Sequence, residues 1–225
     1  MTNPFAFTVA LANETANILI DHTARVWEYL RLARERIDFI CDNSGLELLF
    51  DLALADFLLR GGFAKRIVFH VKPQPFFVSD TMISDVEDAL AALDKSAARE
   101  LSYLARRLRL AIDEKQFVLT DHPFWVTGAF FHEMPADLQA MLAQADLVIS
   151  KGDANYRRLL GDCHWDPTTP FESAAGYFPA TLVALRTLKA ELIVGLKPGE
   201  AERLQAQDPA WRVNGKRGVI QFRRK

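Results

Sequence analysis

Cysteine is scarce in this sequence, and long hydrophobic runs are absent from it. The 225 residues include two cysteines, Cys41 and Cys163, which are too few for a disulfide framework and fit a reducing compartment. No apolar run approaches the roughly 20 residues that a membrane-spanning helix needs. The first residues also lack the positively charged start and the uninterrupted apolar stretch of a signal peptide. We therefore expect a cytoplasmic protein with no membrane partner.

The sequence also has no large excess of positive or of negative charge. The 27 Lys and Arg residues nearly balance the 29 Asp and Glu residues, for a net charge of −2. This balance provides no global basic field that would attract nucleic acid, so we expect no nucleic-acid partner. The glycine-rich motifs GxGxxG and GxxxxGK[ST] and the esterase motif GxSxG do not occur either. A charged substrate must therefore be bound locally, by a few placed side chains.

Strand-like and helix-like segments alternate along the chain. Short apolar runs predict buried strands, and amphipathic or apolar helical segments follow them. Strands are expected at Ile37–Cys41, Arg66–Val71, Phe117–Thr120, Asp146–Ser150, Leu185–Gly195 and, as a last edge strand, Gly218–Phe222. Helices are expected at about Ala12–Arg36, Gly45–Arg60, Ser84–Ala92, Ala97–Asp113, Ala136–Gln144 and Gly199–Gln207. The alternation predicts an α/β fold, with a Rossmann-like three-layer α/β/α core, a mostly parallel sheet and an N-terminal helix.

The same pattern suggests a division of the chain. Residues 1–36 are expected to form an N-terminal helical segment, and residues 37–225 to form the α/β domain. In an open parallel sheet, ligands bind outside the carboxyl ends of the strands. The polar clusters of this sequence directly follow predicted strands, so we expect them to lie together at that edge of the sheet.

Two of these clusters are rich in side-chain oxygens. Asp42 and Asn43 end the first predicted strand, and Glu47 lies one helical turn further on. Asp80 ends the loop after the next strand. Oxygen ligands suit divalent cations such as Mg²⁺ or Mn²⁺. Alternatively, each of these residues caps the following helix, and for Asp42 and Asn43 the spacing alone favours the cap.

Two further clusters carry cations. The segment KGDANYRR contains Lys151 and Arg157, which suit a phosphate group, although a solvated turn has the same composition. In the segment RTLK, the strand period of two places Arg186 on one face and Lys189 on the other. A cation in this apolar stretch must be paired or lie in a cleft. Lys189 is therefore either a ligand-binding lysine or a structural salt-bridge partner.

Four segments in this order resemble subfamily III of the damage-control phosphatase family. They are FICDNSGLELLFDLALADFLL (residues 39–59), FFVSDT (76–81), KGDANYRRLLGD (151–162) and LRTLKAE (185–191). The last contains the RTxK signature of this subfamily, and together the segments span most of the chain from Phe39 onward. Members of the subfamily carry a sizeable amino-terminal helical region, whereas about one predicted helix precedes Phe39 here. The chain is therefore either a compact homologue or a fragment.

The resemblance implies a metal-dependent phosphatase that acts on a phosphorylated sugar such as fructose 1-phosphate or fructose 6-phosphate. The metal ligands that it implies are Asp42, Asn43 and Asp80, and the family favours Mn²⁺, Co²⁺ or Ni²⁺ over Mg²⁺. The resemblance and the charged clusters together predict the substrate-binding residues, which are Asp42, Asn43, Glu47, Lys151, Asp153, Ala154, Asn155, Tyr156, Arg157 and Lys189. The catalytic residues are Asp42, Asp80 and Asp153, the last to orient water or sugar hydroxyls.

Two other functions stay open. A protein carboxyl methyltransferase that uses S-adenosylmethionine would need a glycine-rich pocket after the first strand, and DNSGLE matches such a pocket poorly. A catalytically silent interaction module would not need acidic and basic groups at several strand ends. A phosphatase assay with and without Mn²⁺ separates these functions from the phosphatase.

Overall fold

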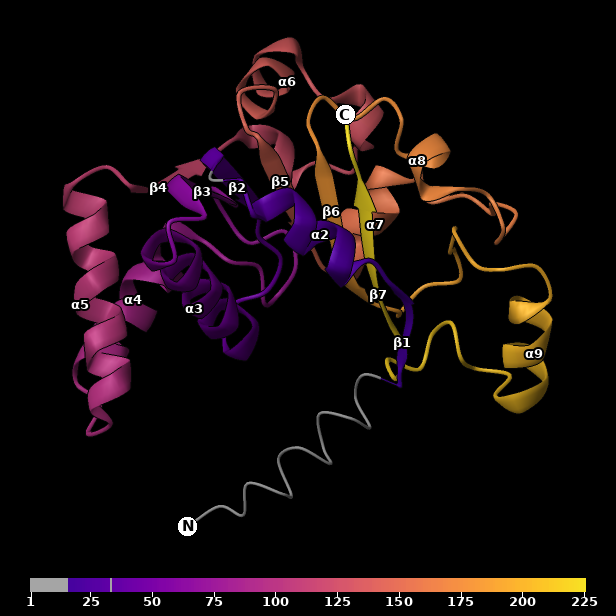
Figure 1. Cartoon of the computed structure of the whole chain (residues 1–225), viewed down its shortest axis with the longest axis horizontal. Helices are drawn as coiled ribbons and strands as arrows, with labels where there is room; N and C mark the ends of the chain where they lie inside the picture. The colour runs from indigo at the N-terminus through magenta and orange to yellow at the C-terminus, as the bar shows by residue number, and fades with distance from the viewer. Residues whose placement is uncertain (1–15, 33) are drawn as a thin grey trace.

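The computed structural model of the chain describes residues 16–32 and 34–225 (Figure 1). Over these residues, seven strands form one sheet in the order β1-β7-β6-β5-β2-β3-β4. The strands are β1 (Ile18–Asp21), β2 (Arg34–Ile40), β3 (Ala64–Val71), β4 (Phe117–Asp121), β5 (Leu147–Lys151), β6 (Leu182–Thr187) and β7 (Gly218–Arg223). Strands β2 to β6 pair in parallel, β7 is antiparallel to β6, and β1 is parallel to β7. The prediction of an α/β fold with a mostly parallel sheet is confirmed.

Helices cover both faces of this sheet (Figure 1). One core contains α2 (Thr23–Leu30), α3 (Leu46–Arg60), α4 (Ile83–Asp94) and α5 (Arg99–Asp113). The other contains the 3₁₀ helices η1 (Pro123–Val126) and η2 (Phe131–Glu133) and the helices α6 (Ala136–Leu142), α7 (Asp153–Leu159), α8 (Phe171–Ala174) and α9 (Glu200–Gln207). Successive strand residues alternate between the two cores, as in Phe39 and Ile40 of β2. The predicted three-layer architecture is therefore confirmed. In the described part of the chain, no helix has the length and apolar character needed to cross a membrane.

The sequence predicts a long N-terminal helix from about Ala12 to Arg36. Over the described residues this prediction is wrong. This segment contains β1, α2 and the start of β2, while residues 12–15 and 33 lie outside the described part. The apolar run of β1 is only three residues long, and so short a run cannot be assigned to a helix or to a strand by its periodicity. The division of the chain after residue 36 stays a prediction.

Two predictions about the last strands also need correction. Strand β7 lies between β1 and β6 and is therefore not at the edge of the sheet. The strand predicted at Leu185–Gly195 begins earlier, at Leu182, and ends at Thr187. The chain leaves the sheet there, and the Arg186 guanidinium donates to the carbonyl oxygens of Ala190 and Leu192 at 2.9 and 2.6 Å. These bonds fold the segment back on itself.

The strand order reverses between β2 and β5. The chain passes from β2 through α3 to β3 on one side, whereas β5 pairs with the other side of β2 and is followed by α7. Because α3 and α7 belong to opposite cores, the loops that leave β2 and β5 diverge and open a crevice between them. Most of the predicted site residues follow these two strands.

Candidate functional site

A cavity of about 550 Å³ opens where β2, β5 and β6 end. Several predicted site residues line it, namely Asp42, Asn43, Glu47, Lys151, Asp153 and Lys189. The rest of its wall is formed by Ile18, Phe50, Gly152, Leu185, Arg186, Thr187, Gly218, Val219 and Ile220. The other predicted residues, which are Asp80, Ala154, Asn155, Tyr156 and Arg157, are not among its lining. The cavity thus combines carboxylates and amines on a partly apolar wall.

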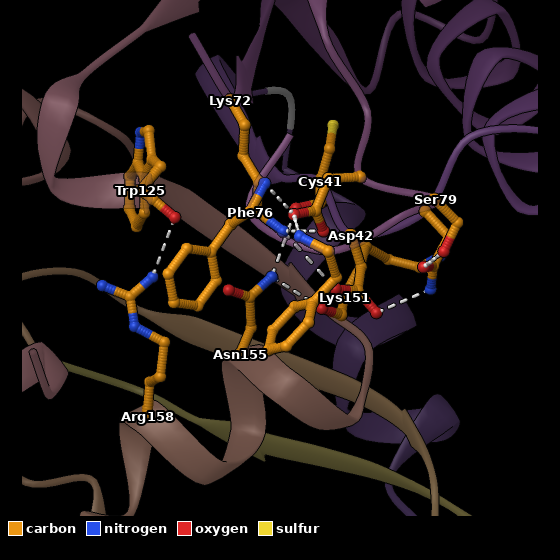
Figure 2. Close-up of polar contacts among 12 residues, drawn as sticks. Cys41, Asp42, Lys72, Phe76, Ser79, Trp125, Lys151, Asn155 and Arg158 are labelled. Carbon is orange, nitrogen blue, oxygen red and sulfur yellow. Dashed lines mark hydrogen bonds and ion pairs between the residues drawn. The ribbon is translucent and has the colours of Figure 1, made fainter. Parts of the chain in front are cut away.

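The loops after β2 and β3 are joined beside this cavity. An isolated antiparallel bridge pairs Asn43 with Asp80, and the Thr81 N–H donates to the Asp42 carbonyl at 3.0 Å. Lys72, the first residue after β3, lies buried between the two aspartates. Its Nζ pairs with Asp80 Oδ1 and lies 4.0 Å from Asp42 Oδ1, and Figure 2 shows Lys72 and Asp42 pointing toward one another. Our sequence reasoning missed Lys72, although a lysine directly after a buried strand is the signal that could have found it.

The carboxylates of Asp42 and Asp80 suit a divalent cation. Backbone N–H groups donate to Asp80 Oδ2 at 2.8 and 2.5 Å, and a neighbouring amide donates to Asp42 Oδ2 at 2.8 Å. The Oδ1 atoms of both carboxylates therefore face the same point, where an ammonium lies. Burial raises the pKa of Asp42 to about 6, because it outweighs the opposing effect of that ammonium. The negative charge of Asp42 is thus incompletely compensated, and a metal would compensate it.

Asn43 is arranged as a donor in this structure. Its Nδ2 donates to Asp42 Oδ2 at 2.8 Å and to Glu47 Oε2 at 3.0 Å, while its Oδ1 accepts from Ser79 Oγ at 2.6 Å. Coordination of a metal through Oδ1 would require this amide to turn, because its Nδ2 now faces Asp42 and Glu47. Over residues 16–32 and 34–225, no three His, Cys, Asp or Glu side chains converge to hold a metal. Asn43 therefore stays a predicted ligand beside the two aspartates.

The loops after β2 and β5 meet at Gly152. This glycine has a φ of +86°, and a Cβ there would lie 1.9 Å from Asp42 Oδ2. The Gly152 N–H donates to the Leu185 carbonyl at 2.9 Å, which ties the loop to β6. Only a residue without a side chain can take this backbone conformation so close to the Asp42 carboxylate. In the sequence, Gly152 is one residue of the segment KGDANYRR, and nothing in that segment indicates its approach to Asp42.

Lys151 is held by two carboxylates of α3. Its Nζ lies 3.1 Å from Glu47 Oε1 and 2.7 Å from Asp51 Oδ1. Burial acts to lower the pKa of Lys151, but the charges and hydrogen bonds of Asp51 and Glu47 outweigh it and raise that pKa. Burial also raises the pKa of Asp51 to about 6. Asp51 was not predicted, and its position four residues after Glu47 on an apolar helix is the signal that could have found it.

The side chain of Arg186 is fully buried beneath the cavity. Its Nε donates to Asp153 Oδ1 at 2.7 Å, and its guanidinium lies over the Tyr156 ring, 4.3 Å from the centroid. Asp153 Oδ1 also accepts the N–H of Lys189 at 3.1 Å. The arginine of RTLK therefore holds the segment in place, and the lysine lies exposed at the cavity. The two residues differ in burial, but Lys189 lies beyond the end of β6 at Thr187, so the predicted strand alternation does not extend to it.

Asn155 and Tyr156 of the predicted phosphate-binding segment are buried on the inner side of α7. Asn155 Nδ2 donates to the carbonyl oxygens of Cys41 and Lys151 at 3.2 and 2.9 Å, which links the ends of β2 and β5. The Tyr156 hydroxyl donates to Gln221 Oε1 at 2.7 Å, and burial raises the pKa of Tyr156 to about 12. Their predicted contacts with substrate stay predictions.

Arg157 lies on the outer side of α7. It makes a bidentate ion pair with Asp162, at 2.8 and 2.6 Å. Together with Lys189 it lines a second cavity of about 370 Å³. Lys189 therefore lies between two cavities, and Arg157 belongs to the outer one.

The fold and the site define a doubly wound α/β domain with a charged, carboxylate-containing site at the point where the strand order reverses. The chain belongs to the damage-control phosphatase ARMT1-like domain family, whose model matches residues 6–204. This result confirms the family resemblance that the four sequence segments indicated.

Individual relatives agree with this assignment. The chain is 42% identical over 216 residues to damage-control phosphatase ARMT1 of Rattus norvegicus, and 41% identical over 218 residues to that of Danio rerio. Each match covers 91% of this chain and 49% of the relative, so the chain spans about half the length of these curated relatives. The crystal structure of a DUF89 family protein from Pyrococcus horikoshii matches with a TM-score of 0.51 and 18% identity, over 91% of this chain and 53% of that one. This last match supports the fold alone.

Proposed function

We propose that this chain is a metal-dependent phosphatase that hydrolyses phosphorylated small molecules, with sugar phosphates such as fructose 1-phosphate and fructose 6-phosphate as substrates. One observation carries the proposal. Asp42, with Asp80 behind it, and the amines of Lys151 and Lys189 meet at one cavity. Carboxylates suit a divalent metal, and amines suit a phosphate group. The name of the matching relatives, damage-control phosphatase, agrees with this chemistry.

The metal would be held by Asp42, Asp80 and, once its amide has turned, Asn43. We propose Mn²⁺, with Co²⁺, Ni²⁺ and Mg²⁺ as alternatives. When bound, such a metal supplies Lewis acidity toward a phosphoryl group. The oxygen-only ligand set fits hard and borderline divalent ions.

The other side chains bind and orient the substrate. Lys151 and Lys189 provide point charges for the oxygens of the transferring phosphoryl group, over which negative charge is spread in the transition state. The carboxylates of Glu47 and Asp51 fix the Lys151 ammonium in position. Because Asp153 Oδ1 is engaged by Arg186 and by a backbone N–H, we assign its Oδ2 to a water or a sugar hydroxyl.

The proposed activity can be tested with a panel of sugar phosphates. Free phosphate is measured with Mn²⁺, with Mg²⁺ and with a chelator present, and fructose 1-phosphate with Mn²⁺ should release phosphate. Calorimetric titration with S-adenosylmethionine should show no binding at about millimolar concentration. Any binding free energy would then be weaker than roughly −4 kcal/mol, the value for a Kd of about 1 mM. Tight binding of S-adenosylmethionine, together with no phosphate release from any member of the panel, would instead support the methyltransferase.

The substitution Lys189→Met should weaken the binding of inorganic phosphate and sugar phosphates by about 2 kcal/mol, the loss expected for one charge-assisted contact. The melting temperature should change little, because Lys189 is exposed. Phosphate binding is measured by calorimetry and unfolding by circular dichroism. The control is Lys197→Met, which removes an exposed lysine outside the lining of both cavities. Equal phosphate affinity in the two variants would remove Lys189 from the proposed site.

A further inference from the structure

Lys72 is a buried lysine at the centre of the predicted metal site. Its exposed fraction is 5%, and those of Asp80 and Asp42 are 4% and 6%. Burial of a single charge without a partner is strongly unfavourable, so these three groups must compensate one another. Our proposed function gives the two aspartates a role and leaves Lys72 without one.

The hydrogen bonds of the two aspartates show where a cation must lie. Asp80 Oδ2 accepts the backbone N–H groups of Phe76 and Phe77, and Asp42 Oδ2 accepts the Asn43 amide. The remaining oxygen of each carboxylate, Oδ1, faces the Lys72 ammonium. A cation that uses both Oδ1 atoms would therefore occupy the space that this ammonium now takes.

We propose that Lys72 is an internal counter-ion, which fills the cation position between Asp42 and Asp80 and is displaced when a divalent metal binds. This inference rests on the metal site of the proposed function. A metal ion at coordination distance from both Oδ1 atoms, about 2.0–2.3 Å, would lie against the ammonium and repel it. Lys72 thus stabilises the metal-free protein and weakens its affinity for metal.

The long, unbranched lysine side chain suits this role. It has several rotatable bonds and a compact charge, so its ammonium can leave the carboxylates without movement of the backbone. The backbone of Lys72 is fixed independently, because its N–H donates to the Thr81 carbonyl at 2.9 Å. The metal-binding loops can therefore keep their positions while the ammonium moves.

The test compares the Mn²⁺ affinity of the whole chain and of two neutral variants, Lys72→Met and Lys72→Gln. Affinity is measured by calorimetry or equilibrium dialysis, without substrate. Both variants should bind Mn²⁺ at least about tenfold more tightly than the wild type, because a competing like charge has been removed. If a variant is unfolded without metal, the Mn²⁺ concentration that restores its circular dichroism spectrum gives the apparent affinity.

The matched control is Lys65→Met, since Lys65 lies on β3, the strand that leads to Lys72, is exposed and pairs with Glu35 at 2.6 Å. Its Mn²⁺ affinity should equal that of the wild type. If the wild type binds Mn²⁺ and both neutral variants bind it with equal or weaker affinity, the proposed role of Lys72 is wrong. The proposed metal site would still be supported. Binding by the neutral variants alone would support the displacement. Absence of Mn²⁺ binding from all proteins would overturn the proposed metal site and the inference with it.

Discussion

The substitution Asp80→Ala should reduce Mn²⁺-dependent phosphate release by about a hundredfold to a thousandfold, because the proposed metal that would stabilise transition-state charge loses a ligand. Asp80 is one of two carboxylates at the predicted metal position, and it also holds the loop before it through the N–H groups of Phe76 and Phe77. Its removal leaves Lys72 facing only Asp42, so the variant should also lose measurable Mn²⁺ binding. Phosphate release, Mn²⁺ titration and circular dichroism provide the three measurements.

Two further variants make this result specific. Asp80→Asn keeps an oxygen for the loop N–H groups and removes the negative charge, so it should fold and still lose activity. Asp94→Ala is the matched control, because Asp94 is a partly exposed aspartate that pairs with Arg106 at 3.2 Å on the surface. It should retain wild-type activity. Full activity in Asp80→Ala would remove Asp80 from the site.

The substitution Gly152→Ala should abolish activity although it removes no functional group from the site. A Cβ at Gly152 would lie 1.9 Å from Asp42 Oδ2, at a backbone φ of +86° that residues with a side chain rarely adopt. Backbone strain and overpacking each cost about 1–3 kcal/mol, so the variant should be destabilised and its Asp42 carboxylate displaced. Activity, Mn²⁺ affinity and the midpoint of urea unfolding should all fall together.

The substitution Gly161→Ala separates the effect of backbone strain from the effect of the clash with a neighbouring side chain. Gly161 has a φ of +73°, and nothing lies within 4 Å of the position of its Cβ. Its substitution should therefore cost only the conformational strain, about 1 kcal/mol, and leave the activity unchanged. Wild-type activity in Gly152→Ala would show that the approach of the two loops is not needed for function.

The sequence was most informative where a pattern extends over many residues. The core strands β2, β3, β4 and β5 and the helices α3, α4 and α5 were predicted to within a few residues, because buried strands and long apolar helices have distinct periods. The position of the site followed from one topological argument, since polar residues after parallel strands must meet at one edge. Asp42, Asn43, Glu47, Lys151, Asp153 and Lys189 do lie around one cavity.

The details that the sequence could not provide depend on contacts between distant segments. Strand β1 is short, and only its pairing with β7 distinguishes it from a helical turn. The role of Gly152 depends on a carboxylate more than a hundred positions away in the chain, so the glycine alone gives no indication of it. Lys72 and Asp51 were missed because a single charged residue after a strand or on a helix is usually solvated. Their pairing with Asp80 and Lys151 emerges only from the fold.

The pairing of β1 with β7 has a consequence for the order of folding. Ile18 of β1 pairs with Gly218 of β7, although the two residues lie near opposite ends of this sequence. Both line the cavity of about 550 Å³, together with Val219 and Ile220. Contacts of such long sequence separation form slowly, because a large loop must close first. During synthesis on the ribosome, β2 to β5 can begin to assemble while residues 218–223 are still to be made. The wall of the cavity would then be completed in the last step, and activity would appear only in a chain whose β7 has docked.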